Sequence, residues 1–452
     1  MLNFRHTFFI DAEDYAYYGR EVKIEGDTLR VPTGHAYRED AIICRKGIAW
    51  TNEIVHQHGL ESVLIEWFPA NSPHCPYLAH TGKGLYVYVK TSNTAVPSLD
   101  VLTGGVIDST QKPIRFKDGF LYYDPDAQIA PEKLCRSLSG TGDCGLDVSG
   151  GVRVFYDEEN IAVQSQSTHS DSTSFTKLPD TQLEVAVFTH DDKTSDTYTD
   201  FFDGALFVAD QPFPRELMLG SHGPIKYLND DLPDFGEGRT RAQDRSWYLT
   251  HVQNPVGLHP KLEIEYNVKK APEGQCKLYS LWTLPKDVFI DRNQFDLHGL
   301  VELYGETDLE LPAYAIEGWG SVLLQEIVDD SPFVVPLHSR YETPNKEPFV
   351  VKVPEPLVFY ACEKPESLVD TATSAFQRPE PFYMSFFPKH VIYHLAARGT
   401  GVTIGIPTLD PGHAGQIEVF TVGTIVIGFL YLLIRLSGVI LGSSEAKKPK
   451  KD

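Results

Sequence analysis

Basic residues are scarce in this sequence of 452 residues. Lys and Arg together number 40, against 62 Asp and Glu, so the formal net charge is −22. Proteins that bind the phosphates of nucleic acids carry charge of the opposite sign. The composition therefore argues against a nucleic-acid partner.

Common catalytic motifs are absent as well. The sequence has no GxSxG elbow, no GxxxxGK[ST] loop and no HExxH pair. Asp124-Pro125-Asp126 has the Asp-x-Asp form of a glycosyltransferase metal site, but the central Pro predicts a turn. His56 and His58 could share one face of a strand, yet two histidines without a third ligand rarely make a metal centre. We therefore expect no catalytic residue, metal or cofactor.

Cysteine is sparse, with six copies and no CxxC or CxxH pair, which argues against a zinc site built on such a pair. Cys135 and Cys144 flank a turn rich in Gly and Ser, whereas Cys276 and Cys362 each adjoin an apolar, strand-like run. An even number permits disulfides in an oxidising compartment, and these four are the candidates. Spacing does not fix the connectivity, and buried free thiols remain the alternative.

Long amphipathic helices are missing from the part of the chain before residue 417. Short runs of alternating, β-branched or aromatic residues lie there between turns rich in Gly and Pro. This pattern predicts an all-β fold of antiparallel, sandwich-like domains. The predicted strands include residues 61–68, 85–89, 152–156, 183–188, 261–268, 349–353, 357–360 and 402–406.

The domain organisation is read from shifts in composition. Residues 164–176 are polar and rich in Ser and Thr, which predicts a loop or linker. We place a boundary near residue 210, between a β-rich N-terminal domain of residues 1–210 and a β-sandwich domain of residues 211–416. A membrane helix of residues 417–441 and a basic tail of residues 442–452 follow.

The longest apolar run lies in residues 419–441. As a helix that rises about 1.5 Å per residue, it is long enough to cross a hydrocarbon core of about 30 Å. Arg435 interrupts the run near its far end. Its long side chain can snorkel to the headgroups, or it can pair with an acidic group on a partner helix.

The flanking charges predict the orientation of this helix. Four Lys follow it, and residues 399–416 before it hold no Lys or Arg, so the positive-inside rule places the tail in the cytosol and the body in the lumen. Lys448 and Lys450 match a KxKxx retrieval signal of the endoplasmic reticulum. Two features give this topology no support: the first residues do not form a secretory signal sequence, and the chain contains no N-glycosylation sequon.

Three stretches in the second half resemble one protein family in order and spacing. The first joins residues 257–262, Cys276 and residues 284–295; the second joins residues 304–312 and 319–321; the third joins residues 336–341 with residues 353–362. Together they resemble the PIG-X family, whose fungal members are called protease B nonderepressible protein. The resemblance covers about residues 245–452.

The resemblance implies a function. PIG-X-like chains are non-catalytic subunits that stabilise the multi-span mannosyltransferase (GPI mannosyltransferase I), which adds the first mannose to the glycosylphosphatidylinositol (GPI) precursor in the endoplasmic reticulum. Such a subunit needs no small-molecule substrate of its own. One alternative is a lumenal chaperone or processing factor, which would have many clients rather than one. The other is a hydrolase of GPI or glycan substrates, in which single Asp or Glu changes would abolish activity.

The family motifs also supply the candidate residues for contact with the partner. On a strand, His338 and Arg340 would share one face, where Arg340 could bind a carboxylate or phosphate, or pair internally with Asp308 or Glu310. Prolines cannot donate ladder hydrogen bonds, so those in the third motif suggest a sheet edge that could dock another chain. The candidates are His259, Asp291, Asp308, Glu310, Pro312, His338, Arg340, Tyr341, Pro354 and Pro356.

Overall fold

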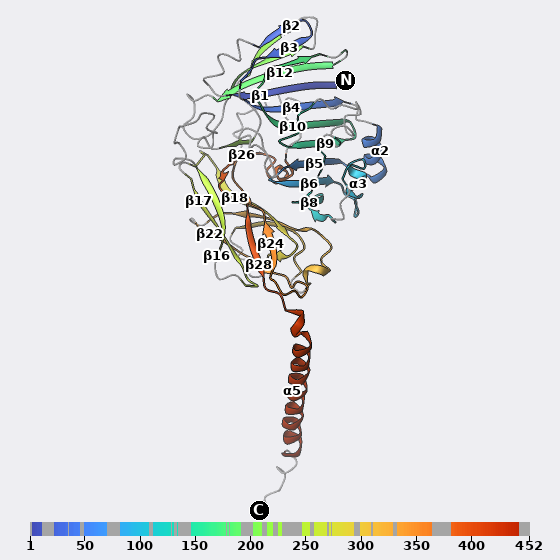
Figure 1. The fold of residues 1–452 in the computed structure, drawn as a ribbon, viewed down its shortest axis with the longest axis vertical. Coiled ribbons are helices and arrows are strands. Elements are labelled where there is room, and N and C mark those ends of the chain that lie inside the picture. Colours follow the sequence, from blue (N-terminus) through green and yellow to red (C-terminus); the bar gives the residue numbers. More distant parts are fainter. Residues whose placement is uncertain are drawn as a thin grey trace, which may run out of the picture.

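The body of the protein is built from strands, and one long helix leaves it as a stalk (Figure 1). This helix is α5 (Ala414–Gly442). The all-β class with an apolar C-terminal helix is therefore confirmed. A computed structural model describes residues 2–10, 22–34, 36–45, 49–69, 82–107, 112–127, 129–130, 133, 146–177, 179, 181–190, 202–209, 215–219, 225–227, 246–253, 257–268, 271–272, 274–292, 299–308, 311–328, 332–363 and 381–442.

The first half of the chain forms one broad sheet. Its strands are β1 (Leu2–Ile10), β4 (Ala36–Arg45), β5 (Ser62–Phe68), β6 (Gly84–Lys90), β7 (Ile114–Phe116), β8 (Gly119–Asp124), β9 (Val152–Asp157), β10 (Asn160–His169), β12 (Thr181–His190), β13 (Phe202–Ala209) and β14 (Arg215–Leu219). They lie in the order β14-β13-β12-β1-β4-β10-β9-β5-β6-β8-β7. Neighbours are antiparallel except β1 and β12, which run parallel.

One face of this sheet is covered by small elements of its own half. Helices α2 (Ala49–His58) and α3 (Leu99–Leu102) pack on β5, β6, β8 and β9 through apolar side chains such as Val55 and Leu102. The three-stranded sheet of β2 (Lys23–Glu25), β3 (Thr28–Val31) and β11 (Thr173–Thr176) covers β1 and β12. Alternation of apolar residues along the strands supplies these two clusters.

The second half is a sandwich of smaller sheets. The strands are β15 (Ile225–Tyr227), β16 (Trp247–Gln253), β17 (Lys261–Asn267), β18 (Cys276–Pro285), β19 (Val288–Phe289), β20 (Leu300–Gly305), β21 (Gly320–Glu326), β22 (Phe333–Pro336), β23 (His338–Ser339), β24 (Phe349–Val353), β25 (Leu357–Glu363), β26 (His390–His394), β27 (Ala396–Ala397) and β28 (Val402–Ile406). A sheet ordered β15-β26-β25-β18-β21-β20 faces one ordered β22-β17-β16-β27, and the pairs β19-β23 and β24-β28 complete the layer. Trp282 lies fully buried between them.

The two halves share a hydrophobic cluster. Tyr86 and Tyr123, on the second face of the broad sheet, pack with Trp319 and Phe359 of the other half. The indole Nε1 of Trp319 donates to the carbonyl oxygen of Leu121 at 2.7 Å. The first sheet ends at Leu219 and the second begins at β15, while the boundary near residue 210 stays a prediction.

Replacing Trp319 by phenylalanine tests this junction. Trp319→Phe keeps an aromatic ring but removes the donor to Leu121, so we expect the free energy of unfolding to fall by about 1–2 kcal/mol. Denaturant unfolding of the full chain in detergent would measure the change. Trp67→Phe is the matched control, because Trp67 makes a longer bond of 3.3 Å to Ala127 from a half-buried position. Equal losses in both variants would contradict the prediction.

The polar stretch at residues 164–176 is not a loop, as its composition suggested, but forms much of β10 and β11. Gln164, Ser165, Gln166 and Ser167 are all buried in the middle of the broad sheet. Their neighbours across the strands explain this burial, since Gln164 lies opposite Arg153 of β9, and Gln166 opposite a carboxylate of β4. Polar side chains tolerate burial where polar partners surround them.

Buried charged residues lie in a row across the broad sheet, on the face that also carries Gln164 and Gln166. Arg5 Nε lies 3.7 Å from Glu184 Oε2, and Arg153 Nε donates to Glu66 Oε1 at 2.7 Å. Glu39 lies on β4, a strand between these two pairs, two residues from Ala41, which is in register with Arg5. Burial raises the pKa of Glu39 to about 7, although the charges of Arg5 and Arg153 oppose the rise.

Replacing Glu39 by glutamine tests the effect of this carboxyl on stability. Since the folded pKa lies above the unfolded value of 4.5, the ionised form is disfavoured in the fold. The free energy of unfolding therefore falls by about 3 kcal/mol as pH rises from below 4.5 to above 7. We expect Glu39→Gln to abolish this fall, measured by denaturant titration at pH 4.5 and pH 8. The exposed Glu265→Gln is the control, and an unchanged pH profile in Glu39→Gln would contradict the assignment.

Two smaller predictions can also be compared with the fold. Asp124-Pro125-Asp126 does form a turn at the end of β8, where the amide of Asp126 donates to the carboxylate of Asp124 at 3.1 Å. The strand proposed for His56 and His58 is wrong, because both lie on α2. On a helix, residues two apart point about 200° away from one another, so they cannot share a face.

Candidate functional site

Arg340 is the centre of the motif residues in the second half. It follows β23 and is 2% exposed. Its Nη1 donates to the carbonyl oxygens of Asp308 and of Leu311, the latter at 2.8 Å, and its Nη2 donates to that of Glu306 at 3.1 Å. The guanidinium therefore fastens the segment after β20 to the end of β23.

The aromatic ring and the negative charges around Arg340 also stabilise its buried guanidinium. Its guanidinium lies 4.4 Å from the ring centre of Phe289, a cation–π contact. Burial lowers the pKa of Arg340, and the negative charges of Asp308, Glu306 and Asp287 oppose the effect. Of the two readings offered by the sequence, the geometry matches the internal one, with main-chain carbonyls as the hydrogen-bond acceptors. Glu310 lies outside the described residues.

Two motif histidines, one from the segment before β17 and one from β23, meet beside this centre. His259 Nδ1 lies 3.0 Å from His338 Nδ1, and the ring of His338 stacks on Phe289 at 5.3 Å between centroids. A hydrogen bond at this distance requires one ring to carry its proton on Nδ1 and the other to accept. Burial and the neighbouring His259 lower the pKa of His338, and the buried Asp291 opposes them. His259 is exposed, so it is the member of the pair that a partner can reach.

Tyr341 and Pro312 lie on the outside of the same region. The amide of Ala313 donates to the carbonyl oxygen of Tyr341 at 3.1 Å. Pro312 precedes the single turn η2 (Ala313–Ala315). The side chain of Tyr341 is 71% exposed and that of Tyr314, in η2, is 67% exposed. This region thus presents Tyr314 and Tyr341 to the surface and keeps Arg340 inside.

The third motif, around Pro354 and Pro356, forms a turn between β24 and β25. Between the prolines, the Glu355 carboxylate accepts from the amide of Thr250 at 3.0 Å and from that of Gly401 at 2.8 Å. Burial raises the pKa of Glu355, while these hydrogen bonds lower it. The carbonyl oxygen of the buried Pro356 accepts from the Tyr248 hydroxyl at 2.6 Å. The hydrogen bonds of this turn therefore connect it to β16 and to the residue before β28.

Cys276 and Cys362 form a disulfide in this half. They lie directly opposite one another on β18 and β25, with 86 residues of sequence separation. The bond therefore joins the two ends of a long segment within the sandwich. Cys135, Cys144, Lys448 and Lys450 lie outside the part of the chain that the structure describes.

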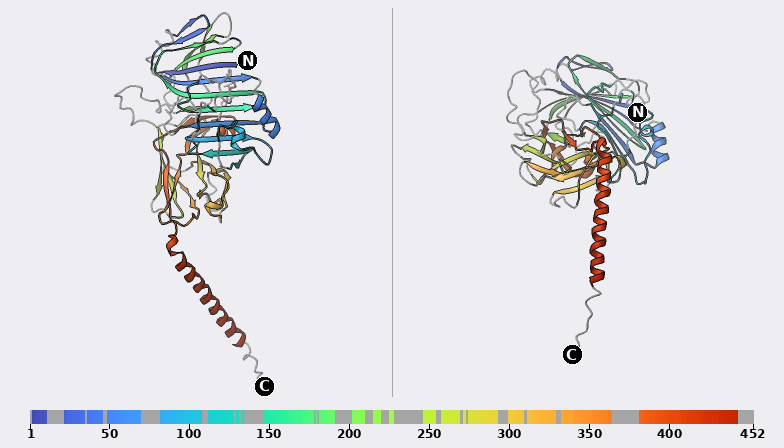
Figure 2. Two further views of the ribbon diagram at one scale, coloured as in Figure 1. Left: turned by 45° about the vertical axis from the view of Figure 1, so that its right-hand side comes forward. Right: turned by 60° about the horizontal axis from the view of Figure 1, so that its bottom comes forward.

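Helix α5 is exposed on all sides. It forms an isolated stalk (Figure 2), and none of its apolar window is buried in the body. Its 29 residues span about 43 Å at about 1.5 Å per residue. By length and composition it could cross a bilayer. Arg435 lies seven residues before its last residue.

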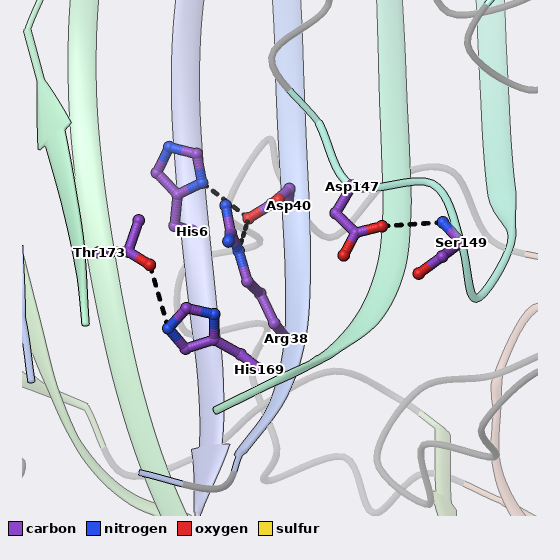
Figure 3. A network of polar contacts seen from close by, with 7 residues as sticks. All are labelled: His6, Arg38, Asp40, Asp147, Ser149, His169 and Thr173. Atoms are coloured by element: carbon purple, nitrogen blue, oxygen red, sulfur yellow. Dashed lines mark hydrogen bonds and ion pairs between the residues drawn. The ribbon is translucent and has the colours of Figure 1, made fainter. Parts of the chain in front are cut away.

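A polar network in the first half was not predicted, and it also serves the fold (Figure 3). His6 Nδ1 and Arg38 Nε each lie 2.7 Å from Asp40 Oδ1. Burial would raise the pKa of Asp40, but the charges of His6 and Arg38 and their hydrogen bonds bring it below its ordinary value. His6 also stacks on Phe175 of β11 at 3.8 Å. The network thus holds β11 on the broad sheet.

These residues offer polar and aromatic groups for binding. Among the residues that the structure describes, no group of three or more His, Cys, Asp or Glu side chains could hold a metal ion. The polar clusters form hydrogen bonds within their own halves, although the buried atoms Asp40 Oδ2 and Arg340 Nε have no hydrogen-bond partner in the described part of the chain. Among the described motif candidates, His259, Asp308 and Tyr341 are exposed, as is the apolar surface of α5.

Comparison with known proteins identifies relatives along most of the chain. Residues 255–437 match the family model described as PIG-X / PBN1. Protein PBN1 of Gibberella zeae is 31% identical over 53% of this chain and 55% of its own length. Protein PBN1 of Debaryomyces hansenii is 28% identical over 78% of each chain. Protein pbn1 of Neurospora crassa is 26% identical over 95% of this chain and 94% of its own length, so the similarity reaches into the first half.

Proposed function

Because the chain belongs to the PIG-X / PBN1 family, we propose that it is a non-catalytic subunit of GPI mannosyltransferase I. It would bind and stabilise the multi-span catalytic subunit, which adds the first mannose to the GPI precursor. The observation that carries the proposal is the extent of the family match. Residues 255–437 take in the β-sandwich from β17 onward and most of α5, so the shared unit is a body joined to an apolar helix.

The helix supports a place in the membrane of the endoplasmic reticulum. Its apolar surface is free for lipid or for helices of a partner. The four Lys after it favour a cytosolic tail and a lumenal body, and Lys448 and Lys450 would retrieve the chain to this compartment. The Cys276–Cys362 disulfide is consistent with the oxidising lumen.

The use of the motif residues supports a non-catalytic role. Arg340 and Glu355 belong to the two parts of the third stretch, and the two Nη atoms of Arg340 and the carboxylate of Glu355 bond to main-chain atoms. Such residues shape a surface rather than contact a substrate. A subunit of this kind acts through the abundance of its partner.

Co-purification tests the proposal. The tagged chain is isolated from microsomes in mild detergent, its partners are identified by mass spectrometry, and the eluate is assayed for mannose transfer from dolichol-phosphate mannose to glucosaminyl-phosphatidylinositol. We expect one multi-span mannosyltransferase in near-equal amount, with activity. Many partners in small amounts would instead indicate a chaperone or processing factor, and activity with this chain alone would indicate an enzyme.

Variants of α5 refine the same experiment. If Arg435 pairs with an acidic group of the partner helix, Arg435→Leu will release the mannosyltransferase while Arg435→Lys retains it. If Arg435 only snorkels, both variants will retain the partner. A chain whose α5 is replaced by a polyleucine helix of equal length is the control for membrane anchoring without specific docking.

A further inference from the structure

Exposed apolar side chains gather at the end of the body from which α5 leaves. More than half of the large apolar side chains that are exposed on the described body lie in three segments there, at residues 311–316, 341–350 and 406–409. Elsewhere on the described body such residues are scattered singly. The six side chains, here called the collar, are Leu311, Tyr314, Tyr341, Phe349, Val350 and Leu409.

Hydrogen bonds join the three segments at this end of the body, where Phe349 lies on the same side of β24 as Val351 and Val350 lies on the other. The amide of Ala313 bonds to the carbonyl of Tyr341, which connects the first segment to the second. The hydroxyl of Thr408 bonds to the carbonyl oxygens of Asn345 and Glu347, each at 2.9 Å, which connects the second to the third. Strand pairing adds to this link, because Phe349 lies opposite Ile406. Figure 1 places β24 and β28 at the end of the body beside the start of α5.

The collar is held in place from behind. Arg340, directly before Tyr341, bonds to the carbonyl of Leu311, so two collar residues adjoin the same buried guanidinium. Val351, Val353, Ile404 and Ile406 fill the core on the inner side of β24 and β28. The collar side chains are therefore exposed on segments whose main chain is held by packed residues beneath it.

The length of α5 determines how far the collar lies from the centre of the bilayer. About 43 Å of helix matches the 40–45 Å of a bilayer with its headgroups, so the helix would end where the headgroup layer ends. Leu409 lies five residues before the helix begins and is exposed. A modest tilt, usual for membrane helices, brings one side of the body onto the bilayer. Tyrosine, with an apolar ring and a polar hydroxyl, is enriched at this level.

We propose that the collar lies in the interfacial layer of the bilayer and holds the body against the lipid headgroups. The inference rests on the proposed membrane crossing of α5 and adds a second, peripheral contact. The charges beside the collar are of mixed sign, since Lys346 lies among Glu342, Glu347 and Asp410. A surface without basic excess favours zwitterionic lipids over anionic ones. The ligand is therefore a phosphatidylcholine-like surface.

Fluorescence quenching in vesicles tests the contact. The full chain is reconstituted into phosphatidylcholine vesicles that carry a nitroxide at the headgroup or deep in the acyl chain. Tyr314→Trp and Tyr341→Trp are compared with the unsubstituted chain, whose signal is subtracted. Because both tyrosines are exposed, the larger ring meets no packing constraint. We expect the headgroup nitroxide to quench both added tryptophans at least twofold more than Val101→Trp, an exposed control on α3 of the other half.

A fourth variant distinguishes the collar contact from the membrane crossing of α5. Phe429→Trp lies in the middle of α5 and should be quenched by the deep nitroxide if the helix crosses the bilayer. Quenching of Phe429→Trp without quenching of the collar variants would overturn the collar contact and leave the crossing intact; it would assign the surface to a protein partner instead. Absence of quenching at Phe429→Trp would overturn the crossing itself, and the collar contact with it.

Discussion

Replacement of Arg340 by alanine should lower the free energy of unfolding of the second half by about 4 kcal/mol. The substitution leaves the carbonyl oxygens of Glu306, Asp308 and Leu311 without their donor in a partly buried place, and each fully buried group of this kind costs about 1–3 kcal/mol. It also removes the cation–π contact with Phe289. Hydrogen exchange of the full chain in detergent would show lost protection around residues 304–308 and 337–341.

Two further variants define the cause. Arg340→Lys keeps the charge but not the planar fork, so we expect it to recover less than half of the loss. Arg115→Ala is the control, because Arg115 also donates to one carbonyl, that of Asn93, and contacts an aromatic ring, but it is exposed. Its loss should stay below about 1 kcal/mol. If Arg340→Lys matched the natural protein, charge alone would suffice and the hydrogen-bond argument would fail.

Removal of the disulfide should have an effect of similar size. The bond between Cys276 and Cys362 closes a segment with 86 residues of separation. In the chain-entropy account, closing a loop of this length contributes about 4–5 kcal/mol by restricting the unfolded chain. We therefore expect the double change Cys276→Ser and Cys362→Ser to lower the denaturant midpoint strongly, measured without reductant.

The reduced natural protein supplies the control for this prediction. A reductant should lower the midpoint of the natural protein by the same amount and leave the double variant unchanged. If reduction has no effect on the natural protein, the two cysteines are not bonded in it. The partner's abundance in microsomes should fall with the stability of this chain, provided that the proposed function holds.

Strands with apolar alternation could be predicted from the sequence, because such alternation has one simple cause, the burial of one face. The runs at residues 152–156, 349–353 and 402–406 are strands in the structure. The second half of β10 could not be predicted, since the buried side chains at residues 164–167 are polar and lie opposite residues of β4 and β9. A polar strand in the middle of a sheet resembles a linker until its neighbours are known.

The contacts of the candidate site could not be predicted from the sequence either. The sequence placed Arg340 on a strand and offered acidic side chains as its partners. The acceptors are instead main-chain carbonyls, which every residue carries and which therefore leave no mark in the sequence. The meeting of His259 with His338, 79 positions apart, likewise depends on strand order rather than on spacing. The signal that could have pointed to the collar is the pair Tyr314 and Tyr341, the first beside a family motif and the second within one.

The parallel pairing of β1 with β12 also governs when the protein can fold. Leu2 pairs with Thr181. One edge of β1, an early strand in the chain, therefore has no partner until β12 has been synthesised. Until then β1 can pair only with β4, and the open edge can bind other chains. Contacts so distant in sequence form slowly. A nascent chain that stops before β12 is therefore expected to aggregate, and the interval between synthesis of β4 and β12 is when this protein most needs protection.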